Sequence, residues 1–348
     1  MDSRETALAF GPEGTLIGVL TQPSAARTDG GGGIACLLLN VGINHRIGPR
    51  RINVKAARRL AEVGIPSLRF DLSGVGDSRA SSGREGFRAQ ALADMRAALD
   101  QLQAGTGATR FLVFGICSGA ANALALALGD KRVVGVSMLD GYVFPTAGVR
   151  IERKLRRWAA FPFNAALRRS YAGWMDWANW ARAPLDAQAR HKAFGRLTGK
   201  ATPTNTEDTG LYQANAPEYN APDFARDINA LVERQVDVYM MYSSTLNAVD
   251  HDHDLMRQLR SEPFMAKVRH RFWPNVDHTV TPLEAQRALL DEVCAWARGM
   301  AVAHPAPHAS ATLAATAATR ASPQQPPRPA APPQAPARRQ LETQQPGY

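Results

Sequence analysis

An apolar segment, a cysteine between two glycines and a run of small residues follow one another in the first half of the chain. Arg110–Ile116 is a predicted buried strand, and Ser118–Leu128 is a predicted helix. A sharp turn between a strand and a helix needs small residues two positions before and two positions after its central residue, because the two elements come close together there. Gly115 and Gly119 have this spacing around Cys117. The pattern predicts a strand–turn–helix unit with Cys117 as its exposed nucleophile.

The chemistry of a thiol suits this position. A cysteine at the N-terminus of a helix lies at the positive end of the helix dipole, which lowers its pKa and favours the nucleophilic thiolate. Ser118 is a weaker candidate, because Ile116 then stands where a small residue is required. The backbone N–H of Ser118 is instead a predicted oxyanion donor. The alternative is a buried structural cysteine beside a glycine turn, which is what we expect of Cys36 and Cys294 in their apolar segments.

Predicted strands and helices alternate along most of the chain. An opening hairpin joins Thr6–Phe10 to Leu16–Thr21 through a turn rich in glycine. Continuous apolar strands that alternate with helices predict an α/β fold, with a mostly parallel central sheet and helices on both faces. The other predicted strands are Ile34–Asn40, Pro66–Asp71, Arg132–Leu139, Val236–Tyr242 and Lys267–Trp273, and the other predicted helices are Arg50–Val63, Glu85–Gln103, Asp252–Arg260 and Thr281–Met300.

The alternation is interrupted between residues 142 and 230, which contain no clear strand but many Trp and Arg residues. We therefore expect a core formed by residues 1–141 and 231–303, with a helical lid insertion at 142–230. Ten of the 23 prolines lie between residues 305 and 348. Because such a composition cannot bury a core, the segment 304–348 is predicted to be a disordered tail rich in Pro and Ala.

His278 is the predicted general base. It follows the predicted strand Lys267–Trp273 and precedes a helix whose start at Thr281 has the sequence of a capping box. An imidazole at this place can deprotonate the thiol. A carboxylate at the end of a neighbouring strand should orient the imidazole. Asp250 and Asp140 are both candidates for this acid, and their positions in the sequence slightly favour Asp250.

The loop after the first apolar strand is the expected source of a second oxyanion donor. The candidate is a backbone N–H near Val41 or Gly42. His45 lies in the same loop. It either lines the substrate pocket or bonds to the backbone of its own loop.

Two further polar segments resemble ligand-binding sequences, but neither predicts a ligand site. Asp250–Asp254 alternates Asp and His, which are possible metal ligands. The alternation places them on opposite faces of a strand, however, and Asp also suits the start of a helix, so no metal site is expected. Asp71–Ser78 is rich in glycine but lacks the Gly-Lys-Ser/Thr sequence of a phosphate-binding loop. We expect no cofactor.

The positive charge is concentrated in two segments. The chain carries a net charge of +10, yet Arg150–Arg169 alone has seven Lys or Arg against Glu152, and residues 301–348 have four Arg against Glu342. The rest is close to neutral, so nucleic acid is not an expected partner. The basic stretch is either a solvated surface or a contact for an anionic acyl carrier or a membrane surface. The sequence has no membrane-spanning segment and no secretory signal, so a cytoplasmic location is expected.

Three tryptophans share one face of a predicted helix in the insertion. Trp174, Trp177 and Trp180 are spaced by three residues. Trp174 and Trp177 are candidates for contact with an acyl or aromatic group of the substrate. Packing of the lid onto the core is the alternative.

Several of these segments together resemble the α/β-hydrolase superfamily. They are the opening hairpin, Arg69–Ser78, the turn Gly115–Ala120 and the pair Asp277-His278. The nearest branch is that of the serine-aminopeptidase-like and acylglycerol-lipase-like hydrolases, while a cysteine at the turn resembles dienelactone hydrolases. The resemblance covers about residues 1–141 and 236–300. Two positions depart from the pattern, since Asn40-Val41 stands where His-Gly is usual and Leu246 where an acid is usual.

The resemblance implies a cofactor-free enzyme that cleaves esters or thioesters. Its substrate is then a small molecule or an acyl group on a carrier. Two alternatives remain open from the sequence. The same acyl-enzyme can pass its acyl group to an alcohol or amine, as in an acyltransferase, and a hydrolase scaffold can also serve as a non-catalytic binding protein.

Overall fold

The computed structural model describes most of the chain up to residue 304. The described residues are 3–24, 33–81, 86–163, 168, 171–182, 184–187, 190, 219–244, 251 and 256–304. Three sequence predictions lie outside them, namely the disordered tail, the acid Asp250 and most of the acidic and histidine-rich segment 250–254.

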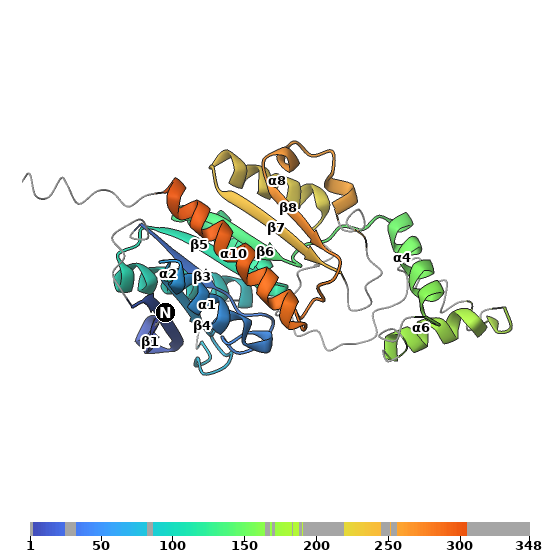
Figure 1. The fold of residues 1–348 in the computed structure, drawn as a ribbon, viewed down its shortest axis with the longest axis horizontal. Coiled ribbons are helices and arrows are strands. Elements are labelled where there is room, and N and C mark those ends of the chain that lie inside the picture. Colours follow the sequence, from blue (N-terminus) through green and yellow to red (C-terminus); the bar gives the residue numbers. More distant parts are fainter. Residues whose placement is uncertain are drawn as a thin grey trace, which may run out of the picture. The chain divides into compact units, whose positions relative to one another are not determined.

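The described residues form an eight-stranded sheet (Figure 1). Its order is β1-β2-β4-β3-β5-β6-β7-β8. β2 runs antiparallel to both of its neighbours, and the strands from β4 to β8 are parallel, which confirms the predicted mostly parallel sheet. The strands are β1 (Ser3–Phe10), β2 (Leu16–Pro23), β3 (Ile34–Leu38), β4 (Ser67–Phe70), β5 (Arg110–Ile116), β6 (Val133–Leu139), β7 (Asp237–Ser243) and β8 (Arg269–Trp273).

Helices cover both faces of the sheet, as Figure 1 shows. Successive side chains of a strand point to opposite faces, so a central strand must be apolar throughout when both faces are covered. In β3, Ile34 and Cys36 pack on the face of α1 (Ile52–Glu62) and α10 (Leu283–Ala303), whereas Ala35 and Leu37 pack on the opposite face. The helices of that second face are α2 (Phe87–Thr106), α3 (Ser118–Gly129) and α8 (Ala221–Glu233).

Helix α8 belongs to this core, although the sequence places most of it in the lid insertion. Phe224, Ile228 and Leu231 are buried in the core cluster, because their spacing puts them on one face of the helix. The helix starts with a capping box between Asn220 and Asp223. Tyr142, Val143 and Phe144 of the expected insertion also pack against this core. The other described helices of the insertion, α4 (Ala147–Ala160) and α6 (Tyr171–Arg182), contact each other and are called the α4–α6 unit below.

One predicted helix start differs from the structure. The last helix begins at Leu283, and the predicted capping box at Thr281 is not formed. The Thr281 side chain instead lies 2.9 Å from the hydroxyl of Thr279, and its backbone N–H donates to Asp277. The start of the predicted helix Asp252–Arg260 lies outside the described residues. Its described part contains helical Met256 and a 3-10 turn, η3 (Arg257–Leu259), which is followed by a second 3-10 turn, η4 (Pro263–Ala266).

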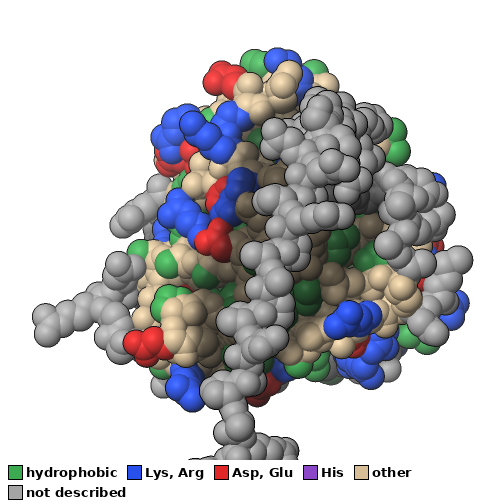
Figure 2. All heavy atoms as spheres, turned by 90° about the vertical axis from the view of Figure 1, so that its left-hand side faces the viewer, with side chains coloured by type: hydrophobic (Ala, Val, Ile, Leu, Met, Phe, Trp, Pro, Cys, Tyr) green, Lys and Arg blue, Asp and Glu red, His purple; other side chains and the backbone are tan. Residues whose placement is uncertain are grey.

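Charged groups on the described core are largely balanced locally. On the face shown in Figure 2, Lys and Arg side chains lie in small groups beside Asp and Glu side chains. Arg132, for example, forms ion pairs with Asp130 and Asp100. Among the described helices, none combines the length and apolar composition that crossing a bilayer requires.

Candidate active site

Cys117 occupies the turn between β5 and α3 in a strained conformation. Its φ of 57° and ψ of −118° lie in a region that residues other than glycine rarely adopt. The flanking glycines are required by contact, since a Cβ on Gly115 would lie 2.1 Å from the carbonyl oxygen of Gly119, and a Cβ on Gly119 would lie 2.5 Å from that of Asn40. The sequence argument from small residues is therefore matched by the geometry of the turn.

The order of strands brings the polar candidates to one edge of the sheet. Cys117 follows β5, Asp140 follows β6 and His278 lies in the loop after β8. Parallel strands place their carboxyl ends at a common edge, where sites of α/β proteins are formed. His278 Nδ1 lies 2.9 Å from Asp140 Oδ2, and the side chain of His278 also forms a hydrogen bond with the Cys117 thiol. Of the two acids left open by the sequence, Asp140 makes this contact, and Asp250 lies outside the described residues.

Ser243 fixes the carboxylate of Asp140. The backbone N–H of Ser243 donates to Asp140 Oδ1 over 2.7 Å, and its hydroxyl donates to Oδ2. Asp140 itself has a left-handed φ of 51°, and its N–H donates to the carbonyl of Met241 on β7. Ser244, which follows Ser243 in the chain, donates its hydroxyl hydrogen to the carbonyl of Val276 in the loop that carries His278. The end of β7 thus orders both the acid and the histidine loop.

The electrostatics favour a charged pair of Cys117 and His278. The hydrogen bond to His278 holds the pKa of the Cys117 thiol below its ordinary value, against the opposing effect of burial. The hydrogen bonds to Asp140 and to Cys117 raise the pKa of His278 to about 10. In contrast, burial raises the pKa of the other two cysteines, Cys36 and Cys294, which are free and buried as expected. Of the three cysteines, Cys117 alone is partly exposed and has a lowered pKa.

This pair predicts a pH dependence of thiol reactivity. Because alkylation requires the thiolate, the rate of reaction of Cys117 with iodoacetamide should fall to half only at a pH below about 8.5, the value of a free thiol. In His278→Gln the stabilising partner is lost, so the half-point should move upward. Alkylation followed by peptide mass spectrometry across pH measures this at Cys117 alone. A wild-type half-point at or above that of the variant contradicts the thiolate–imidazolium pair.

The oxyanion loop lies against the start of α3. The backbone N–H of Gly42 donates to the hydroxyl of Ser118 over 2.7 Å, and Gly42 has a left-handed φ of 59°. This bond places the loop residues Val41 and Gly42 beside the N-terminus of α3, as the sequence predicts. It also engages the N–H of Gly42, which the sequence does not anticipate. That donor becomes available to another oxygen only when the Ser118 hydroxyl gives it up.

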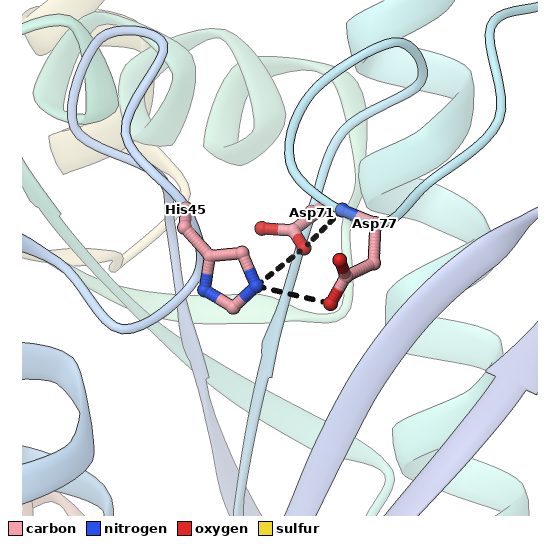
Figure 3. Close-up of side chains that lie close together, drawn as sticks. All are labelled: His45, Asp71 and Asp77. Carbon is pink, nitrogen blue, oxygen red and sulfur yellow. Dashed lines mark hydrogen bonds and ion pairs between the residues drawn. The ribbon is translucent and has the colours of Figure 1, made fainter.

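A buried ion pair holds the same loop. The carboxylate of Asp71, fully buried at the end of β4, accepts hydrogen bonds from Nη1 and from the backbone N–H of Arg46, each over 2.5 Å, and a further one from Asn40 Nδ2. Figure 3 shows that His45 Nε2 points to the same group, 3.5 Å from Asp71 and 3.1 Å from Asp77. The His45 side chain therefore contacts the carboxylates of Asp71 and Asp77 rather than the backbone of its own loop.

His45, Asp71 and Asp77 could each offer one ligand atom to a metal ion. Nη1 of Arg46, however, donates to Asp71 Oδ2 and, over 2.8 Å, to Asp77 Oδ2. The hydrogen bond from Arg46 also lowers the pKa of the Asp77 carboxyl. A guanidinium thus already lies on the oxygens that a metal would need, and the arrangement is that of a structural ion-pair network.

Replacing Asp71 by Asn should destabilise the protein by about 3 kcal/mol, because it leaves the largely buried charge of Arg46 paired only with the exposed carboxylate of Asp77. Urea denaturation of the full chain measures the change. Asp291→Asn is a matched control, since it removes an ion pair with Arg59 between two exposed side chains, and a change within about 0.5 kcal/mol is expected there. Equal stability of the two variants would show that the Arg46–Asp71 pair does not hold the loop.

The tryptophans of the insertion pack within it. Trp177 stacks on Phe161 with ring centroids 5.2 Å apart, and Trp174 meets the same ring edge-on at 5.1 Å. The two indoles also contact each other at 6.1 Å. Their ring contacts among the described residues are thus within the α4–α6 unit, whereas the alternative left open by the sequence was packing of the lid onto the core.

Comparison with known families gives the class of protein. The sequence profile of the alpha/beta hydrolase family matches residues 49–293, which is well over half of the chain. The chain belongs to the alpha/beta hydrolase family. The match spans the Cys117 turn, Asp140 and His278. No curated protein matches the sequence.

Several solved structures are similar to this alpha/beta hydrolase at low sequence identity. An esterase from Thermogutta terrifontis has 15% identity, with 85% of this chain and 98% of that chain covered and a TM-score of 0.45. The thioesterase domain from the curacin biosynthetic pathway has 16% identity, with 84% and 99% covered and a TM-score of 0.45. A dienelactone hydrolase from Anabaena variabilis has 15% identity, with 85% and 97% covered and a TM-score of 0.43.

Two groups of this site are absent from the sequence predictions. The sequence predicts no role for Ser243, although Ser243 and Ser244 directly follow a buried apolar segment, which is a possible signal. That segment, β7, lies beside β6, the strand that precedes Asp140. Arg46 and Asp71 lie far apart in the sequence, in two loops rich in turn residues. The contact between Arg46 and Asp71 follows only from the pairing of β3 with β4 in the sheet.

Proposed function

We propose that this alpha/beta hydrolase cleaves an ester or thioester through an acyl-enzyme on Cys117. One observation carries the proposal, the chain of contacts from the strained Cys117 through His278 to Asp140. A thiolate held beside an imidazolium is a strong nucleophile at neutral pH. A carboxylate on Nδ1 keeps the imidazole oriented with its other nitrogen toward the thiol.

In the first half of the reaction, Cys117 Sγ attacks the carbonyl carbon and the carbonyl oxygen gains a negative charge. The backbone N–H of Ser118 stabilises this oxyanion, together with an N–H of the loop at Val41 or Gly42. If Gly42 is the second donor, its bond to the Ser118 hydroxyl is exchanged for one to the substrate. His278 then protonates the leaving alcohol or thiol as the bond to the acyl carbon breaks, which leaves a thioester on Cys117.

In the second half, neutral His278 takes a proton from water, and the hydroxide attacks the acyl carbon. Collapse of this second tetrahedral species releases the carboxylic acid and restores the thiolate–imidazolium pair. The cycle needs no cofactor. The hydrogen bond from His278 to Asp140 weakens the reading of the chain as a mere binding protein, since that reading depended on a histidine without an acid.

The test is the reaction of the full-length protein with p-nitrophenyl acetate and with acetyl-CoA, followed by product release and by intact mass. We expect an acetyl adduct that maps to Cys117 and then disappears. Cys117→Ala should lose both adduct and turnover, whereas Cys294→Ala should keep them, because Cys294 is buried. A Cys117→Ala variant with wild-type turnover sinks the mechanism. An adduct that is resolved only by an added alcohol or amine indicates an acyltransferase instead.

A further inference from the structure

Exposed apolar side chains are concentrated on the α4–α6 unit. Of the ten large apolar side chains that are exposed among the described residues, six lie between residues 147 and 187. These six are Leu155, Trp158, Phe163, Trp174, Met175 and Leu185. Scattered apolar residues are normal on a protein surface, but such a group in one short segment marks a surface that contacts something apolar.

Helix α4 contributes an apolar stripe to this surface. Ile151, Leu155 and Trp158 have the spacing of one helical face. Leu155 and Trp158 remain 47% and 45% exposed. The small core of the unit is formed instead around Phe161, which packs on the α6 tryptophans Trp174 and Trp177.

The same segment carries most of the chain's excess positive charge. Residues 147–190 contain nine Lys or Arg and three Asp or Glu, a net +6 of the chain's +10. Glu152 is the single acidic residue of α4, and it lies 3.8 Å from Arg257 outside the segment.

We propose that the α4–α6 unit binds the surface of an anionic lipid bilayer. Tryptophan is suited to the boundary of a bilayer, because its ring is apolar and its N–H is polar. Lys and Arg beside an apolar stripe are attracted to anionic headgroups, and such a helix lies in the interface instead of crossing it. This inference is independent of the proposed catalytic function.

Two other occupants fit the surface less well. A second copy of the chain could cover the apolar side chains, but it would bring two segments of net charge +6 together. A soluble anionic carrier such as coenzyme A matches the charge, but its binding gives no reason for six exposed apolar side chains on the same unit. Only an anionic bilayer meets both the charge and the apolar surface.

Flotation of the full-length protein with vesicles tests the proposal. We expect it to float with vesicles of phosphatidylcholine and phosphatidylglycerol at low salt, and at least about tenfold less with phosphatidylcholine alone or at high salt. The tryptophan emission should shift to shorter wavelength on binding. Absence of flotation with the anionic vesicles at low salt overturns the proposal, and so does binding that salt does not weaken.

Matched variants locate the binding surface. Arg153→Glu with Lys154→Glu should lower binding at least about tenfold, whereas Lys131→Glu with Lys267→Glu, which removes the same charge from exposed positions elsewhere, should not. Leu155→Ser with Trp158→Ser should likewise weaken binding, in contrast to Leu283→Ser with Val302→Ser. If a double variant and its control lose binding equally, the effect comes from overall charge or hydrophobicity, and the proposal is overturned. An unchanged pH profile of Cys117 alkylation shows that each variant is folded. The test measures binding to vesicles, so it stays valid even if the protein proves to have no catalytic activity.

Discussion

Asp140→Asn is expected to lower kcat/KM of the Cys117-dependent reaction by about 10² to 10³-fold while the protein stays folded. The carboxylate accepts the Nδ1 proton of His278 over 2.9 Å, and an amide in its place lacks the negative charge and can present its own N–H groups to the ring. In serine triads the same change costs about 10⁴-fold. A smaller loss is expected here, because a thiol gives up its proton more readily than a hydroxyl.

The measurement is the rate of p-nitrophenyl ester cleavage together with the pH profile of Cys117 alkylation. The profile of Asp140→Asn should shift to higher pH, since a less basic His278 stabilises the thiolate less, and this effect outweighs the weaker repulsion that is removed with the Asp140 charge. Asp100→Asn is a matched control, because its carboxylate is exposed and bonded to Arg132 away from the site. A wild-type rate and profile in Asp140→Asn would falsify the assignment of Asp140 as the orienting acid, and Asp250→Asn is then the variant to measure.

Gly115→Ala is expected to destabilise the protein by about 4 kcal/mol or more, which is exceptional for the addition of one methyl group. The new Cβ would lie 2.1 Å from the carbonyl oxygen of Gly119 and 2.7 Å from the backbone nitrogen of Ala120. These are backbone atoms of α3, so no side-chain rotation relieves the contact. The helix has to move away from β5, which opens the core beneath the turn.

Urea denaturation of the full chain, followed by circular dichroism, measures this effect. Gly299→Ala is the matched control, because a Cβ at this position in α10 meets open space. That change should be neutral or stabilising by up to about 1 kcal/mol, as helix propensity predicts. If Gly115→Ala unfolds at the same urea concentration as the wild type, β5 and α3 do not come as close together at the Cys117 turn as the structure has them.

The local features of the fold were already determined by the sequence. Buried strands between covered faces require continuous apolar runs, and β3 and β5 show such runs directly in the order of their residues. The turn at Cys117 depends only on residues within two positions of it, so the spacing of Gly115 and Gly119 was enough to predict it. The position of His278 after the last strand and before the last helix followed from the same alternation.

The tertiary structure decided which distant groups meet. Asp140 is 138 residues from His278 in the chain, and only the adjacency of β6, β7 and β8 brings the carboxylate, Ser243 and the histidine loop together. The Arg46–Asp71 pair likewise depends on β3 lying beside β4. Spacing along the chain carries information about neighbours within a few residues, whereas strand order and side-chain direction set the contacts across a sheet edge. The strained turn at Cys117 could therefore be predicted from the sequence, whereas the choice between Asp140 and Asp250 could not.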